Sequence, residues 1–317
     1  MSLEFIHGLD NLTTAQEPGS AITVGTFDGI HRGHQEILRQ LQVAAGKAGL
    51  HPVLVTFDPH PRLVVTPDDA PPLLTTLPEK ERFLPDFLDG TALILKFDER
   101  LRSLTAGEFV TQILIERLRI RHLVVGYDHA FGKGRGGTIV ELRRMGKEQG
   151  FGVEVVNPVS VGDTVVSSSE IRRTLQRGDM TRATELLGHP YAICGRVGRG
   201  IGLGRKLGYP TANIAYHPRK CLPKAGVYSC RVSVGDGRHE GMMFIGRNQF
   251  NPDRPVTVEA NIFNFDRDLY DQSVAVYPIA FIRENRRFDS ADALARQIDQ
   301  DKQKVLRISQ KENVSWQ

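Results

Sequence analysis

Apolar runs alternate with helical patterns along the first half of the chain. Between short β-prone runs, apolar residues recur at helical spacing, as Ile37, Leu38 and Leu41 do. Such alternation is typical of a parallel sheet covered by helices on both faces. We therefore predict strands at Ile22–Gly25, Pro52–Phe57, Ala92–Phe97, His122–Gly126 and Val153–Val156, and helices at Gln35–Ala45, Lys80–Leu88, Gly107–Leu118 and Ile139–Gln149.

The pattern changes beyond Leu187. Strand-like runs are now broken by Gly, Pro and Asn, and one clear helix, Ser290–Arg307, ends the pattern with Leu294, Ile298 and Val305 on one side. Runs of this kind predict a small antiparallel β-barrel with a packing helix after it. Its strands are expected at Tyr191–Val197, Val227–Val234, Gly241–Gly246, Val256–Phe263 and Ser273–Ile282. The sequence thus predicts an α/β domain over residues 1–187 followed by a β domain over residues 188–317.

Composition narrows the class of protein. With 317 residues and 40% hydrophobic content, the chain has enough apolar material for two packed cores. Three cysteines indicate free thiols in a reducing compartment, and no apolar run is long enough to span a bilayer, so we expect a cytoplasmic protein without a membrane partner. The basic charge lies in the second half and is scattered, which favours small anionic ligands over nucleic acid.

The segment Val24–His34, VGTFDGIHRGH, joins a predicted strand to a predicted helix. Its glycines let backbone amides approach an anion, and the helix N-terminus adds partial positive charge. His31 and His34 are in position to donate hydrogen bonds to phosphoryl oxygens. We interpret the segment as a site for phosphoryl or nucleotidyl transfer.

Two other interpretations of the histidines remain open. His31 and His34 are also potential metal ligands, although no Cys, Asp or Glu follows at a usual zinc spacing. The segment is also compatible with a plain loop and helix cap.

Other polar clusters follow the ends of the predicted strands. Asp58-Pro59-His60-Pro61 follows the second strand, and Gly126-Tyr127-Asp128-His129 follows the fourth. Ligands of parallel sheets bind beyond the carboxyl ends of the strands, so we expect one cleft here.

A serine-headed helix follows the fifth strand. Ser167 and Ser168 precede a helical pattern that carries Arg172. The serines are compatible with N-caps, with Glu170 as the partner in a capping box, and equally with an anion site. Arg172 favours the anion site, because a guanidinium binds phosphate oxygens bidentately.

The stretch Gly195–Ile214 is too rich in glycine for an ordinary connection within the predicted barrel. Its glycines and the basic residues Arg199, Arg205 and Lys206 are suited to wrapping a polyphosphate, although a long barrel loop is the alternative. Thr211 and Asn213 adjoin it and offer hard oxygen ligands for Mg²⁺ or its waters.

Taken together, these motifs resemble the prokaryotic bifunctional riboflavin kinase/FAD synthetases along nearly the whole chain. The resemblance implies a Rossmann-like nucleotidyltransferase domain of the HxGH type that adenylylates FMN with ATP and releases pyrophosphate. His31 and His34 would stabilise the transition state, and Arg172 would act with them on phosphate. The other residues that the resemblance implies for nucleotide or flavin binding are Gly25, Phe27, Asp58, His60, Asp128, Ser167 and Ser168.

The second half resembles the riboflavin kinase barrel of the same family. By that resemblance the glycine loop and the PTAN motif bind ATP and Mg²⁺, with Thr211 and Asn213 holding the metal, and Glu259 accepts the proton of the ribityl hydroxyl. The loop residues implied in binding are Gly198, Gly204 and Arg205. Riboflavin, FMN, FAD and ATP are the implied substrates and products, and we expect a monomer or weak homo-oligomer that binds small molecules and no nucleic acid.

The kinase half departs from the family pattern at three places. Phe244 and Asn248-Gln249 replace residues of the pattern NIGxxPTF, and Asn261 stands where a His is common. Two alternatives therefore accompany the prediction of a bifunctional enzyme. One is an FAD synthetase with a non-catalytic flavin-binding barrel, and the other is an HxGH enzyme that acts on another phosphorylated substrate.

Overall fold

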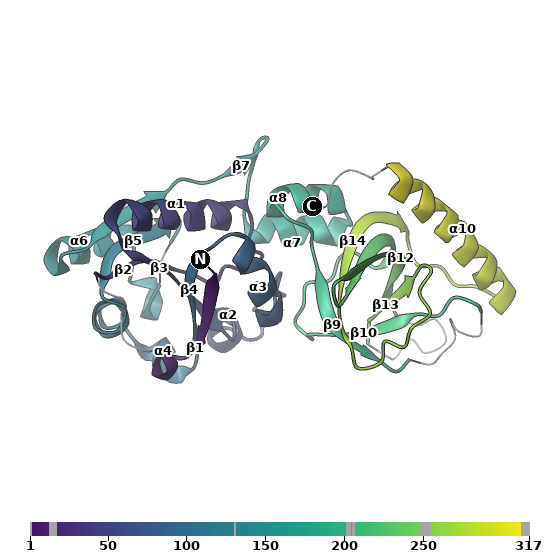
Figure 1. The fold of residues 1–317 in the computed structure, drawn as a ribbon, viewed down its shortest axis with the longest axis horizontal. Helices are drawn as coiled ribbons and strands as arrows, with labels where there is room; N and C mark the ends of the chain where they lie inside the picture. Colours follow the sequence, from purple (N-terminus) through teal and green to yellow (C-terminus); the bar gives the residue numbers. More distant parts are fainter. Residues whose placement is uncertain are drawn as a thin grey trace. The chain divides into compact units, whose positions relative to one another are not determined.

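The computed structural model divides the chain into two compact units, Met1–Ser167 and Ser168–Gln317 (Figure 1). It describes residues 2–12, 18–129, 131–200, 204, 207–247 and 255–311. Among these described residues, no helix is long and apolar enough to cross a membrane.

The first unit is built on a parallel sheet of six strands. Along the sheet the order is β1-β4-β3-β2-β5-β6, and every pair is parallel. Because β3 and β4 lie on one side of β2 while β5 and β6 lie on the other, the strand order reverses at β2. The strands are β1 (Leu3–His7), β2 (Ser20–Val24), β3 (His51–Asp58), β4 (Gly90–Lys96), β5 (Ile120–Gly126) and β6 (Gly152–Val156).

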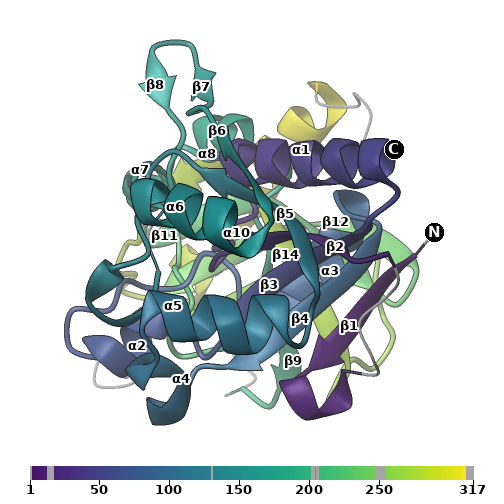
Figure 2. The same ribbon diagram turned by 90° about the vertical axis from the view of Figure 1, so that its left-hand side faces the viewer.

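Helices cover both faces of this sheet, as predicted (Figure 2). On one face, Val53 and Val55 pack with α5 (Ala106–Phe109), its π-helical continuation η3 (Val110–Ile115) and α6 (Ile139–Gln149). On the other, α1 (Arg32–Ala48) packs against β2, β3 and β5. The smaller elements are η1 (Leu9–Asn11), α2 (Pro61–Val65), α3 (Leu77–Phe83), η2 (Leu84–Asp86), α4 (Glu99–Ser103), η4 (Lys133–Arg135), β7 (Ser160–Val161) and β8 (Thr164–Val165).

Several predicted helices have other bounds in the structure. Gly107–Leu118 is α5 followed by η3, which ends at Ile115. The prediction for α3 was also wrong. Instead of Lys80–Leu88, helix α3 begins at Leu77, because Thr76 and Glu79 form a capping box at its start. It ends at Phe83, where Pro85 lacks the amide hydrogen that continued α-helix needs and the chain passes into the 3₁₀ turn η2.

The second unit contains a closed barrel of six antiparallel strands in the order β10-β13-β12-β11-β14-β9. The five predicted barrel strands are present, and β10 is an additional one. Their bounds are β9 (Ile193–Gly198), β10 (Ala212–Tyr216), β11 (Gly226–Val234), β12 (Gly237–Gly246), β13 (Thr257–Ile262) and β14 (Ser273–Arg283). Along β13 the side chains of Val258 and Ala260 are buried, whereas Glu259 between them is partly exposed. This alternation separates the barrel interior from its outer face.

Two helices precede the barrel in the same unit, α7 (Ser168–Arg177) and α8 (Met180–Leu187). The Leu175 carbonyl of α7 accepts a hydrogen bond from the Lys224 amide at 2.9 Å, and α8 packs against β14. The structure thus groups both helices with the barrel, and the domain boundary predicted after residue 187 stays a prediction.

Helix α10 (Ala291–Lys311), yellow in Figure 1, packs on the outside of the barrel. Val305 is fully buried there with Val227 and Met242, and Ile298 joins the cluster. A buried ion pair fixes the helix: Asp301, 1% exposed, lies 2.7 Å from the Arg283 guanidinium of β14. The prediction that this helix packs through Leu294, Ile298 and Val305 is confirmed for Ile298 and Val305, whereas Leu294 is partly buried outside this cluster.

We expect Asp301→Ala to lower the free energy of unfolding of the barrel unit by about 3 kcal/mol, because it leaves the Arg283 guanidinium buried without its partner. Urea denaturation followed by circular dichroism measures the change. Asp289→Ala, at an exposed position before α10, is the matched control and should change stability by less than about 0.5 kcal/mol. Equal stability of the two variants would contradict a structural role for the pair.

Candidate active sites

The loop between β2 and α1 is held tightly at the carboxyl edge of the sheet. The Gly25 amide donates to the Val55 carbonyl at 3.0 Å, and the Thr56 hydroxyl donates to the Thr26 carbonyl at 3.3 Å. Phe27 and Ile30 have left-handed backbones, with φ of 47° and 43°, yet both side chains are buried. Strained, buried loops of this kind cluster at functional sites, where surrounding packing maintains the strain.

The two predicted histidines lie face to face at the start of α1. His31 is the N-cap residue, and its Nδ1 accepts a hydrogen bond from the His34 amide at 3.4 Å. The rings stack with centroids 3.6 Å apart. Gly33 makes room for this arrangement, since a Cβ there would lie 3.3 Å from the His31 ring. The structure therefore brings His31, His34 and the helix N-terminus together.

The environment of His34 favours the neutral imidazole. Burial lowers its pKa well below the ordinary histidine value, and the charges of His31 and Lys80 lower it further. Within the described part of the chain, its buried Nδ1 has no hydrogen-bond partner. Unpartnered buried nitrogens are rare and are typical of functional sites.

A buried polar cluster that the sequence analysis missed supports the loop. The Asp28 carboxylate accepts hydrogen bonds from the Thr75 amide at 2.9 Å and the Thr75 hydroxyl at 3.4 Å, and that hydroxyl accepts one from the Gly29 amide. The pattern Thr76-x-x-Glu79 is a capping-box signature and could have shown where α3 begins. Nothing in the sequence pattern indicated that Asp28 and Thr75 would meet.

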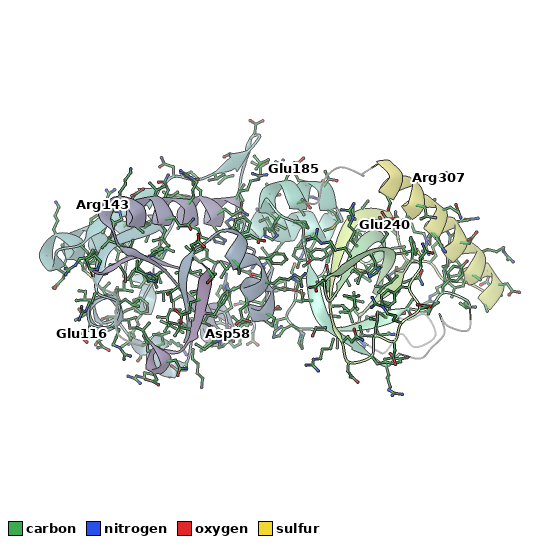
Figure 3. All side chains as sticks on the ribbon, in the orientation of Figure 1. Asp58, Glu116, Arg143, Glu185, Glu240 and Arg307 are labelled. Carbon is green, nitrogen blue, oxygen red and sulfur yellow. The ribbon has the colours of Figure 1, made fainter. Side chains whose placement is uncertain are left out.

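The predicted residues at the other strand ends lie on strands next to β2 or just beyond them. Asp58 ends β3 and is exposed (Figure 3). His60 caps α2 through its Nδ1, which accepts from the Arg62 amide at 3.2 Å. Asp128 follows β5 and is exposed. Because β3, β2 and β5 are adjacent and parallel, these polar residues follow the same edge of the sheet. The expectation of a single cleft stays a prediction.

The serine-headed segment falls at the division between the units. Ser167 is the last residue of the first unit, and Ser168 and Arg172 lie on α7 of the second. All three are partly buried. Glu170 forms ion pairs with Arg173 at 3.0 Å and Arg177 at 3.2 Å, so two neighbouring arginines neutralise the one acidic residue in the first turn of α7.

The predicted kinase residues meet on the outer face of the barrel. Asn213 of β10 lies directly opposite Glu259 of β13, which places their side chains on the same face. The Thr211 hydroxyl donates to Glu259 Oε2 at 3.2 Å, and the Thr257 hydroxyl lies 3.2 Å from Oε1. Across the described residues no cluster of three His, Cys, Asp or Glu side chains is suited to a metal ion. Side-chain oxygens are instead offered by Thr211, Asn213, Thr257 and Glu259.

The glycine loop approaches these residues closely. Gly198 pairs with Asn213, and a Cβ at Gly200 would lie 2.3 Å from the Asn213 amide nitrogen. A Cβ at Gly204 would lie 2.3 Å from the Tyr209 carbonyl oxygen. A side chain at Gly204 would force the backbone at Tyr209 to move, and a side chain at Gly200 would displace the Asn213 side chain. The predicted binding residue Arg205, with Lys206, lies outside the described residues.

Two departures from the family pattern have structural roles. Phe244 lies opposite Glu259 on β12 and packs with the cluster under α10. The Asn261 side chain is 7% exposed and donates to the Pro210 carbonyl at 2.7 Å. Asn261 therefore holds the residue that precedes Thr211. The third departure, Asn248-Gln249, lies outside the described residues.

We expect Asn261→Ala to reduce about tenfold the riboflavin phosphorylation that the motifs predict, because losing this hydrogen bond shifts Thr211 away from Glu259. A kinase assay with riboflavin and ATP measures the effect, and FAD formation from supplied FMN serves as the internal control. Asn261→His should retain most of the activity, since an imidazole also presents an N–H donor. An alanine variant as active as the wild type would show that the contact does not position Thr211.

Models of two protein families match the two halves of the chain. FAD synthetase matches residues 13–170, and riboflavin kinase matches residues 187–309. The order of the two domains is the one that the sequence motifs predicted.

Whole-chain comparisons agree. The bifunctional riboflavin kinase/FMN adenylyltransferase of Escherichia coli K12 is 36% identical over 300 residues, which cover 94% of this chain and 96% of the relative. The enzyme with the same description from Pseudomonas fluorescens is 38% identical over 300 residues, with the same coverage of both chains. A crystal structure from Streptococcus pneumoniae, described as a macrolide-efflux protein, matches with a TM-score of 0.82 at 32% identity, covering 96% of this chain and 98% of that one. With domains, order and length all in agreement, the chain belongs to the family of bifunctional riboflavin kinase/FMN adenylyltransferases.

Proposed function

We propose that the first unit adenylylates FMN through the stacked pair His31 and His34, and this pair at the N-terminus of α1 is the observation that carries the proposal. A phosphate oxygen of FMN attacks the α-phosphorus of ATP. The bond between the α-phosphorus and the oxygen that bridges it to the β-phosphorus breaks, and pyrophosphate leaves. The ring N–H groups of the two histidines donate hydrogen bonds to the phosphoryl oxygens as negative charge builds on them. The proposed reaction has no covalent enzyme intermediate, so it requires no nucleophilic side chain. The loop contributes by positioning the reactants and stabilising charge.

The remaining predicted residues of this reaction have supporting roles in the proposal. Gly25 and Phe27 shape the loop at the helix N-terminus, where backbone amides attract phosphate. Asp58, His60 and Asp128 follow the same edge of the sheet and would bind the flavin or the nucleotide. Ser167, Ser168 and Arg172 would bind phosphate oxygens, the arginine bidentately.

In the second unit we propose that Glu259 is the general base for riboflavin phosphorylation. Its carboxylate accepts the proton of the ribityl 5′-hydroxyl, the hydroxyl oxygen attacks the γ-phosphorus of ATP, and ADP leaves. Gly198, Gly204 and Arg205 belong to the loop that would wrap the ATP phosphates.

The donor set of this site fits Mg²⁺. The Thr211 hydroxyl and the Asn213 amide are hard oxygen ligands, and Glu259 adds a carboxylate 3.2 Å from Thr211. Thr211 and Asn213 would hold the ion or its waters, and when bound it would neutralise charge on the phosphates. Glu259 keeps its role as proton acceptor in this arrangement.

One assay tests both reactions. The purified chain is incubated with riboflavin, ATP and Mg²⁺, and FMN and FAD are separated by chromatography, with a second reaction that starts from FMN. We expect FMN and FAD from riboflavin, and FAD from FMN. If FAD forms from supplied FMN but no FMN forms from riboflavin, the barrel is a flavin-binding module without kinase activity. FMN without FAD would assign the HxGH site to another phosphorylated substrate.

A further inference from the structure

Lys80 is a buried lysine at the HxGH loop to which the reaction so far gives no role. It lies in α3 and is 5% exposed. Across the described residues, no ion pair joins its ammonium to a carboxylate. Buried ammonium groups are costly unless something compensates the charge, so this position requires an explanation.

A series of contacts fixes Lys80 beside the loop. Asp28 binds the amide and hydroxyl of Thr75, and the next amide, of Thr76, donates to Glu79 Oε2 at 2.8 Å. The Lys80 amide in turn donates to the Thr76 carbonyl at 2.9 Å. Asp28, Thr75, Thr76 and Glu79 are all buried. The start of α3 is therefore tied to the β2–α1 loop through buried hydrogen bonds, and Lys80 is the next residue of that helix.

Nearby charged groups influence the pKa of Lys80, and Lys80 influences the pKa of His34. Burial lowers the pKa of Lys80, while the carboxylates of Asp28 and Asp58 act in the opposite direction. The charge of Lys80 contributes to the lowered pKa of His34. Asp28 is already bound by Thr75, and Asp58 is exposed to water. Lys80 is therefore a buried lysine on an element that buried hydrogen bonds tie to the loop at the N-terminus of α1, and a polyanion bound at that loop would compensate its charge.

We propose that the Lys80 ammonium binds a phosphate group of the nucleotide at the HxGH loop and stabilises the charge that collects on the departing pyrophosphate. The lysine forms no covalent bond in this role. The proposal rests on the proposed adenylyl transfer, to which it adds a third polar group from a different element. A lysine that serves only as a counter-ion for Asp28 and Asp58 is the competing explanation, and the experiment separates the two.

The test uses the full chain with Lys80→Met, which removes the charge and keeps an unbranched apolar stem. FAD formation is measured at saturating FMN, with inorganic tripolyphosphate and adenosine as inhibitors competing with ATP. We expect kcat/KM for ATP to fall about 30-fold or more, as when one partner of a buried charge contact is removed. The inhibition constant of tripolyphosphate should rise about tenfold, whereas that of adenosine should change less than about twofold.

Two control variants accompany Lys80→Met. Lys80→Arg keeps the positive charge and should recover part of the affinity for tripolyphosphate. Lys47→Met removes a charge from an exposed position in the last turn of α1 and should leave all constants unchanged. Riboflavin phosphorylation in the second unit reports whether the chain remains folded.

Three outcomes decide the matter. Wild-type kcat/KM in Lys80→Met would overturn the proposal. Equal weakening of adenosine and tripolyphosphate, with a lower unfolding temperature, would also overturn it and assign Lys80 to loop structure. If the wild type forms no FAD, the proposed function fails instead, and calorimetric binding of tripolyphosphate to the wild type and to Lys80→Met decides the role of Lys80 separately.

Discussion

Replacing His31 by alanine should lower the rate of FAD formation from FMN by about two orders of magnitude or more, the usual effect of removing one donor to a developing oxyanion. The His31 ring stacks on His34 at 3.6 Å and stands at the N-terminus of α1, so its loss removes a donor and also frees the neighbouring ring. The rate is measured with FMN, ATP and Mg²⁺ under saturating conditions. FMN formation from riboflavin should stay within about twofold, because the proposed base Glu259 lies in the other compact unit.

A second variant separates the chemistry of His31 from its structural role as a helix cap. Asparagine is a good N-cap, so His31→Asn should retain an acceptor for the His34 amide and keep α1 intact, whereas alanine loses the cap at a cost of about 1 kcal/mol. We expect the two variants to differ in thermal stability and to share a large loss of FAD formation. An asparagine variant with full activity would contradict the proposed role and leave His31 as a cap.

The sequence predicted the elements whose pattern is strong. The predicted central strands contain short apolar runs, such as Val53–Val55 and Ala92–Leu95, and such runs are typical of central strands in parallel sheets. The sequence analysis did not predict the edge strand β1, because Leu3–His7 is short and partly exposed. Strand β10 was not predicted either. Its segment Ala212–Tyr216 contains Ala and Asn, which have weak β-propensity, and it follows a glycine loop.

The residues of the candidate sites likewise include some that local sequence motifs predicted and others that no local pattern indicated. Motifs compact in sequence, such as the pair His31 and His34, were predicted and come together in the structure. Asp28 and Thr75 are 47 residues apart, and their contact follows from the packing of α3 against the β2–α1 loop rather than from any local pattern. The burial of Lys80 could not be predicted from the sequence either, because lysines in helices are usually exposed to solvent.

Glu259 carries the largest expected effect in the second unit. Its carboxylate is held on both oxygens, by Thr211 at 3.2 Å and by Thr257 at 3.2 Å, and it faces Asn213 across the β10–β13 pair. A carboxylate oriented in this way has little freedom to turn, which is the property that a general base requires.

Glu259→Gln should therefore lower kcat for riboflavin phosphorylation by about two to three orders of magnitude, because the amide keeps the shape and the hydrogen bond from Thr211 but cannot accept the proton. FMN release from riboflavin and ATP measures the loss, and FAD formation from supplied FMN should persist at the wild-type rate. Glu240→Gln, on β12 of the same barrel (Figure 3), is the matched control and should leave kcat unchanged. If Glu259→Gln raised KM for riboflavin with kcat intact, Glu259 would bind the substrate without acting as its base, and the proton would have to leave by another route.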